Sequence, residues 1–271
     1  MNPTSHVLGG PFGARKPVSR IKRLGGFTVK LLAVAIVVWS ATGLDIHWPF
    51  ILDAPRQVLD LGLRMLPPDI SFVDDIVPPM LETINIATLG TVLAGALSVP
   101  VALMAAQNTT INQATLWAAR VIVVSSRSVN ELIWAIIFAE IFGPGPFAGV
   151  VAIAVSSVGF TSKLIAEGIE EIDSGQVEAV TATGAGQGKV LAYGIVPQIM
   201  PTVAGVLTFR WDINIRQSSV IGLVGAGGIG ITLNSAMNLF NWDQVSVILL
   251  AILLAVLASD WVSNILRRQF I

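Results

Sequence analysis

The sequence predicts an all-α integral membrane protein with about six membrane-spanning helices. Only 12% of the 271 residues are charged and 54% are apolar, whereas an ordinary soluble domain is about 25% charged. Several windows reach the roughly 20 apolar residues that a helix needs to cross a bilayer. One or two such windows fit a large soluble core, but five or six do not. The predicted spans lie near 27–44, 84–106, 114–142, 147–165, 197–216 and 245–265.

The chain begins with a basic segment. Residues 1–26 contain five Lys and Arg residues and no acidic one. Because a basic flank stays on the cytoplasmic side of an apolar run, we expect 1–26 to be cytoplasmic and 27–44 to be the first span. The rival interpretation is a signal peptide with 31–43 as its apolar region. A leader of 26 residues is long for a signal peptide, which favours a retained span.

Residues 45–77 are polar and rich in proline, so we expect an extracytoplasmic loop. Within it, Arg56, Asp60 and Arg64 recur at every fourth position among apolar residues. This pattern predicts a short helix with a narrow charged stripe that lies on the membrane surface. The first span and this loop therefore make up residues 27–77. The remaining residues, 78–271, form the helical core, which Pro78-Pro79 opens.

Small residues and turn residues organise the core. Gly90 and Gly95 are of the kind that lets helices approach closely. The serine-rich segment 125–128 is expected to break the third helical segment, and Gly143-Pro144-Gly145-Pro146 predicts a turn. Six spans place both termini in the cytoplasm, in agreement with the terminal Arg267-Arg268. The loop near 167–196 then also lies in the cytoplasm, even if the first span is removed.

Ionisable residues inside spans are functional candidates, because each costs several kcal/mol unless it is paired or lines a water-filled path. Their spacing predicts two helical ion pairs, Arg127 with Glu131 and Asp212 with Arg216. The alternative is that the arginines attract an anion, since guanidinium groups match phosphoryl oxygens. Both interpretations stay open. The candidate path residues are Arg127, Ser128, Glu131, Arg210, Asp212, Asn214 and Arg216.

Catalytic, metal and nucleotide chemistry find little support. The sequence has no cysteine and two distant histidines, and no catalytic pair stands out. The string 225–230 has dinucleotide-binding spacing after the strand-like 219–224, but it lies between apolar spans without a βαβ pattern. The string 184–189 resembles a phosphate loop but has Val190 where Ser or Thr must hold magnesium. We therefore expect no nucleotide, metal or nucleic acid to bind this chain, and no catalytic residue in it.

The segment from Glu178 to Pro197 carries the most specific pattern. Ala179 follows Glu178, Gly184 comes six residues after Glu178, and Pro197 comes nineteen after it. This spacing resembles the EAA loop of bacterial ABC importer permeases, a short cytoplasmic helix that docks on a separate ATPase. In that interpretation Glu178 presents a charge, Ala179 permits close approach, Gly184 ends the helix and Pro197 starts the next span. Val180 departs from the family's second alanine.

The resemblance extends over residues 78–268. Segments 128–135, 143–149, 163–173, 210–216 and 220–230 together resemble the permease subunit of phosphonate ABC importers. The resemblance implies the permease (MetI-like) fold in a bacterial inner membrane and a second copy of the permease. It also implies a cytoplasmic ABC ATPase dimer that holds ATP and Mg, an extracytoplasmic phosphonate-binding protein, and transport by alternating access within membrane lipid. The permease itself would have no cofactor.

Two functions other than an ATP-driven permease fit parts of the sequence. A stand-alone anion channel or secondary transporter would use the same intramembrane charges without an ATPase. A membrane-embedded enzyme is the weaker alternative, because the sequence shows no catalytic residues. Co-purification of an ATPase with this chain distinguishes an ATP-driven permease from a stand-alone channel or secondary transporter.

Overall fold

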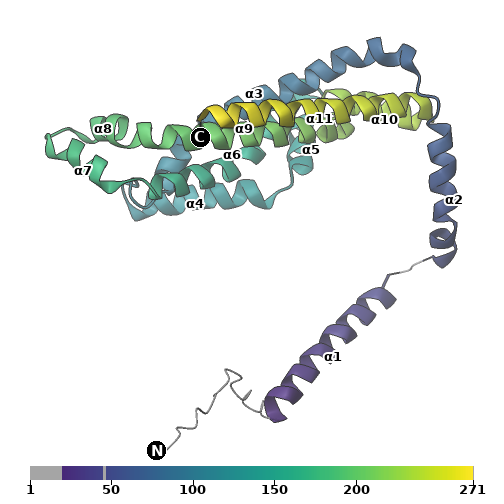
Figure 1. Ribbon diagram of the computed structural model, residues 1–271, viewed down its shortest axis with the longest axis horizontal. Helices are drawn as coiled ribbons and strands as arrows, with labels where there is room; N and C mark the ends of the chain where they lie inside the picture. The colour runs from purple at the N-terminus through teal and green to yellow at the C-terminus, as the bar shows by residue number, and fades with distance from the viewer. Residues whose placement is uncertain (1–19, 45–46, 271) are drawn as a thin grey trace, which may run out of the picture. The chain divides into compact units, whose positions relative to one another are not determined.

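The computed structural model describes residues 20–44 and 47–270, and the described residues form helices joined by short turns (Figure 1). The chain forms two compact units, and the boundary between them in the sequence lies between Val58 and Leu59. In the first unit, α1 (Arg20–Thr42) contains an 18-residue window from Gly25 to Thr42 that is apolar and fully exposed. Such a helix suits a hydrocarbon environment. Most of the predicted cytoplasmic segment 1–26 lies outside the described residues.

The next helix, α2 (Trp48–Arg64), has no buried residue. Its predicted charged stripe is present, because Arg64 Nη2 lies 2.7 Å from Asp60 Oδ2 one turn away. The short helix is therefore confirmed. Its position on the membrane surface stays a prediction, as does the division of the chain at residue 77.

Long helices form the second unit. In Figure 1, α3 (Val73–Ala105), α6 (Pro146–Glu170), α9 (Val196–Ile221) and α11 (Trp242–Phe270) run alongside one another. Contacts join α3, α6 and α9 mutually, while α11 packs on α9 and α4 (Gln113–Ser128) packs on α6. The other elements are η1 (Ile70–Phe72), α5 (Glu131–Phe142), α7 (Ser174–Ala182), α8 (Gln187–Val190), the π turn η2 (Leu191–Ile195), η3 (Gly222–Val224) and α10 (Ile229–Asn238).

The number of spans agrees with the sequence. Five helices of the described chain are long and apolar enough to cross a membrane, and a sixth crossing results if α4 and α5 count as one bent span. Exposed leucines on α11, among them Leu253, Leu254 and Leu257, give that helix a lipid-compatible surface. The prediction of an all-α membrane protein with about six spans is confirmed.

The bend between α4 and α5 lies at the serine-rich segment. The helix α4 ends at Ser128, and α5 starts at Glu131 at an angle of 94°. Asn130 stabilises the new start, because its Oδ1 accepts a hydrogen bond from Leu132 N at 2.9 Å. The predicted helical pair of Arg127 with Glu131 is wrong, because the bend puts the two residues on different helices.

Small residues explain the tight contacts of α3, as predicted. A Cβ added at Gly90 would lie 2.6 Å from Ile153 Cγ2 of α6, and one at Gly95 would lie 2.9 Å from Leu207 Cδ2 of α9. Neither site accommodates a side chain without repacking. The two glycines therefore let α3 contact two helices at once.

Two predicted boundaries differ from the structure. Pro78 and Pro79 lie inside α3, which begins at Val73. The prolines remove hydrogen bonds to the carbonyls of Asp74 and Asp75, but both residues are exposed, so water can supply partners. Residues 219–224, which appeared strand-like, instead form the end of α9 and the turn η3, which contacts α10.

Candidate functional site

The first candidate site is the coupling segment, defined as residues 173–198. Its helix α7 starts after Asp173, whose Oδ1 accepts a hydrogen bond from Gly175 N at 2.9 Å. It ends at Ala182, and Gly184 follows with φ of +76°. Gly184 N donates to Thr181 O at 3.0 Å. Gly184 therefore occupies the left-handed position that ends many helices, as the sequence predicted.

The coupling segment presents Glu178 and Ala179 outward. No residue of α7 is buried, and both of these side chains are exposed. Val177 and Val180 are half-buried, and both lie near Gly194 of the π turn. One face of α7 is thus anchored, while the face with the charge and the small residue is open to a partner.

Gln198 joins the coupling segment to α9. Its Oε1 accepts a hydrogen bond from Asp173 N at 3.0 Å, and its Nε2 donates to Gly194 O at 2.6 Å and to Asp173 O at 3.4 Å. One side chain therefore ties the start of α7 to the first turn of α9. Sequence reasoning missed this residue, because its partners are backbone groups, which leave no pattern in the sequence.

Pro197 stands at the start of α9, as the sequence predicted, but the helical winding begins before it. Helical winding begins at Gln187, runs through the π turn and continues to Val224. Pro197 lies at the beginning of α9, directly after the π turn. A π turn changes the hydrogen-bond register, so it accommodates a residue that has no N–H to donate.

The second candidate site lies on α9, where the predicted path residues separate onto two faces. Successive helical residues are turned by about 100°, so Arg210 and Asn214 share one face while Asp212 and Arg216 lie about 200° away. The first face meets α6 and α3, and the second meets α11. The four residues therefore form two separate groups.

A directed chain of hydrogen bonds connects the first face to α6 and α3. Arg210 Nε donates to Ser157 Oγ at 2.9 Å, and Ser157 Oγ donates to Asn214 Oδ1 at 3.3 Å. Asn214 Nδ2 donates to Thr91 Oγ1 at 2.8 Å. Gln217 accepts from Arg210 Nη2 at 3.1 Å. We name this the Arg210 network; it satisfies both ends of the Asn214 amide, which is fully buried.

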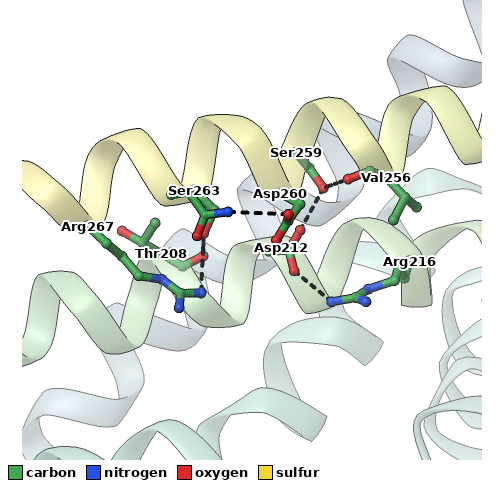
Figure 2. Close-up of polar contacts among 9 residues, drawn as sticks. Thr208, Asp212, Arg216, Val256, Ser259, Asp260, Ser263 and Arg267 are labelled. Atoms are coloured by element: carbon green, nitrogen blue, oxygen red, sulfur yellow. Dashed lines mark hydrogen bonds and ion pairs between the residues drawn. The ribbon is translucent and has the colours of Figure 1, made fainter.

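The second face carries the predicted ion pair. Arg216 Nη2 lies 2.6 Å from Asp212 Oδ2, which confirms the predicted pairing (Figure 2). Asp212 Oδ1 also accepts a hydrogen bond from Ser259 of α11 at 2.7 Å, and the Asp212 side chain is 7% exposed. The bond from Ser259 attaches α9 to α11, while the ion pair joins two successive turns of α9.

The remaining path candidates lie on α4 and α5. Arg127 and Ser128 are exposed at the end of α4. The aliphatic part of the Arg127 side chain packs closely on Gly159 of α6, because a Cβ added at Gly159 would lie only 2.8 Å from Arg127 Cγ. Glu131 is half-buried at the start of α5. The 94° bend between α4 and α5 separates Glu131 from Arg127 and Ser128.

The glycine string 225–230 is a connector between α9 and α10. Gly228 N donates to Glu82 Oε1, and Ile229 N donates to Thr83 Oγ1, each at 2.8 Å. Glu82 therefore occupies a position that a phosphate group would need. Across residues 20–44 and 47–270, no group of three His, Cys, Asp or Glu residues could hold a metal ion.

Comparisons with known proteins extend this picture. Residues 98–271 match the family described as "Binding-protein-dependent transport system inner membrane component". The sequence is 36% identical to the "Putative phosphite transport system permease protein HtxC" of Stutzerimonas stutzeri, over 93% of this chain and 89% of that protein. It is also 36% identical to the "Phosphate-import permease protein PhnE" of Mycolicibacterium smegmatis, over 77% of this chain and 39% of that one.

A solved structure supports the fold. The inward-facing MetNI methionine ABC transporter aligns with a TM-score of 0.66 and 20% sequence identity, over 75% of this chain and 99% of the matched chain. At this identity the likeness bears on the fold alone. It agrees with the arrangement of helices described above.

Proposed function

Because the chain belongs to the binding-protein-dependent transport system inner membrane component family, and is thus the permease subunit of an ABC importer, we propose that its substrate is phosphonate or a related phosphorus oxyanion. The relatives whose names refer to phosphite and phosphate support this substrate class. Arg210 also suits it, because a guanidinium matches phosphoryl oxygens in geometry and charge.

The observation that carries the mechanism is the anchored coupling segment. The outer face of α7 presents Glu178 and Ala179, while Gln198 bonds the start of the same helix to α9. When ATP closes a partner ATPase dimer, α7 moves with its docking site. Because Gln198 and the π turn link it to α9, the motion passes as a rigid displacement into the span that contains Arg210. Access to the path then alternates between the two sides of the membrane.

The rest of the assembly follows from this mechanism. The partners are a second copy of the permease, a cytoplasmic ABC ATPase dimer that holds ATP and Mg, and an extracytoplasmic phosphonate-binding protein. Both termini and the coupling segment lie in the cytoplasm. No bond is made or broken in this chain, which has no cofactor of its own. A stand-alone channel or secondary transporter would need no coupling segment.

Reconstitution tests the substrate. The permease is placed in proteoliposomes with its ATPase and binding protein, and uptake of labelled methylphosphonate, phosphite and phosphate is measured with and without ATP. We expect ATP-dependent uptake of at least one of the three anions. Uptake that persists without the ATPase, or absence of uptake for all three, contradicts the proposal.

A further inference from the structure

The turn between α3 and α4 is bonded to the last turn of α6. We name residues 106–112 the α3–α4 turn. Within it, Gln107 N donates a hydrogen bond to Glu170 Oε1 at 2.8 Å. Asn108 Nδ2 donates to Ile169 O at 2.6 Å, and this carbonyl is one of those that the end of a helix leaves without an intrahelical partner. Both donors belong to the turn and both acceptors to α6, so the two bonds tie these elements together.

The α3–α4 turn is also attached to the helices on either side of it. Thr109 Oγ1 donates a hydrogen bond to Leu103 O of α3 at 2.8 Å. Asn112 caps α4, because its Oδ1 accepts a hydrogen bond from Thr115 N at 2.8 Å. A displacement of the turn therefore moves the adjoining ends of both helices.

A groove separates the α3–α4 turn from α7. It has a volume of about 540 Å³ and is lined by residues of both elements, among them Ile111 and Val177. In the described part of the chain, no hydrogen bond crosses this groove from the turn to α7. Helix α6 is close to both elements in the chain of contacts, because it ends at Glu170 and only residues 171–173 precede α7. The hydrogen bonds that reach the turn from the side of α7 therefore pass through the end of α6.

Apolar packing joins the same helices. A cluster of buried residues has members from α3, α6, the π turn and α9, namely Ala102, Ala106, Ile165, Ala166, Ile169, Ile195 and Ile199. Such packing is non-directional, and packed helices slide past one another in many domain motions. Hydrogen bonds need defined distances and angles, so they fix the relative position of the groups that they join. The cluster therefore holds the helices together, and the bonds of Asn108 and Glu170 fix their register.

We propose that Asn108 and Glu170 are positioning residues that pass the motion of α7 into α3 and α4, an arrangement that we name the α6 relay. This inference rests on the proposed function, in which an ATPase displaces α7. Gln198 passes that displacement to α9. The bonds of Glu170 and Asn108 pass it through the end of α6 to the α3–α4 turn. Helices α3 and α9 then shift together instead of sliding past each other.

The ratio of uptake to ATP hydrolysis tests the α6 relay. The permease is reconstituted with its ATPase and binding protein, and uptake of methylphosphonate, phosphite and phosphate is measured together with ATP hydrolysis. Glu170→Ala is expected to lower the ratio about threefold, because Gln107 N loses its acceptor. Glu170→Gln keeps an acceptor oxygen and should restore a ratio close to that of the wild type. Because Glu170 is exposed, the thermal unfolding midpoint should stay the same in both variants.

Glu171→Ala is the matched control. Glu171 is the next residue of the chain and is also exposed, but its carboxylate makes no hydrogen bond or ion pair within the part of the chain that the structure describes. Its ratio of uptake to ATP hydrolysis is expected to equal that of the wild type. A fall as large as in Glu170→Ala would overturn the relay, since it would show a general effect of charge at the end of α6.

Spin-label distances test the motion itself. The sequence has no cysteine, so labels attach only at introduced sites. Ile111→Cys on the turn and Glu171→Cys at the end of α6 are both exposed positions. The labelled permease is bound to the ATPase, and the distance is measured without nucleotide and with a nonhydrolysable ATP analogue. We expect the same distance in both states, and a changed distance with the analogue when Asn108→Ala and Glu170→Ala are added.

The two assays separate this inference from the proposed function. If the wild type imports a phosphorus oxyanion and Glu170→Ala keeps its ratio of uptake to ATP hydrolysis, the relay is overturned and the importer stands. A label distance that differs between the two states of the wild type also overturns the relay, as does a constant distance in the Asn108→Ala and Glu170→Ala variant. If the wild type imports none of the three anions, the substrate proposal fails, and the label distances, which need no substrate, still decide the relay.

Discussion

The coupling segment and the interior of α9 are held by different kinds of contacts. In α7 no residue is buried, and the helix is defined by a cap at Asp173 and a left-handed glycine at position 184. In α9, Asn214 is fully buried and bonds partners 57 and 123 residues away in the sequence. The first region follows local rules of helix termination, whereas the second exists only when three helices are assembled. Substitutions in the two regions should therefore affect different properties.

The largest effect is expected at the end of α7. Gly184→Trp places a bulky side chain at φ of +76°. This left-handed backbone conformation costs a non-glycine residue roughly 1–2 kcal/mol, so we expect the end of α7 to be displaced. Transport is expected to fall to background while ATP hydrolysis continues, measured as uptake and phosphate release in proteoliposomes. Gly186→Ala is the control, because its φ is −67° and an added Cβ meets nothing within 4 Å. Normal coupled transport by Gly184→Trp would refute the role of the segment.

The interior of α9 should show a loss of stability instead. Asn214→Ala leaves the buried hydroxyls of Ser157 and Thr91 without their amide partner, which costs about 1–3 kcal/mol. The thermal unfolding midpoint of the purified permease is expected to fall. Asn264→Ala is the control, since that exposed amide bonds only Asp260. Equal midpoints for the two variants would argue against the importance of the network.

The connection between the two regions should give the smallest effect. Gln198→Ala removes the hydrogen bonds to Asp173 and Gly194, each of which contributes about 1 kcal/mol. We expect uptake per ATP hydrolysed to fall about threefold, with little change in thermal stability. Gln198→Glu keeps the acceptor for Asp173 N but loses the donor, so its coupling ratio should be intermediate. An unchanged ratio in Gln198→Ala would mean that the π turn alone transmits the motion.

Local patterns in the sequence were enough to predict much of this molecule. The spacing of Glu178, Ala179 and Gly184 predicted an exposed helix ended by glycine, and the four-residue spacing of Asp212 and Arg216 predicted their ion pair. Both features depend on residues within one or two turns of each other. The apolar windows predicted the spans for the same reason.

Long-range partners could not be predicted from the sequence. The partition of Arg210 and Asp212 onto opposite faces follows from helical periodicity, but the identity of their partners Ser157 and Ser259 requires the assembled bundle. The pairing of Arg127 with Glu131 failed because the spacing rule assumes a continuous helix, and the chain bends between them. Gln198 was missed because its three bonds go to backbone groups, which have no sequence signature.

The contact of Glu82 and Thr83 with the glycine connector has a consequence for the order of assembly. These hydrogen bonds join residues 146 positions apart in the chain. They therefore cannot form until Gly228 and Ile229 have been synthesised, long after α3 has entered the membrane. Closing so long a loop carries a large entropic cost before the contact stabilises the fold. Docking of α10 onto α3 is thus a late step of biogenesis, and a chain that stops before Gly228 would leave the half-buried Glu82 carboxylate without the backbone N–H that donates to it.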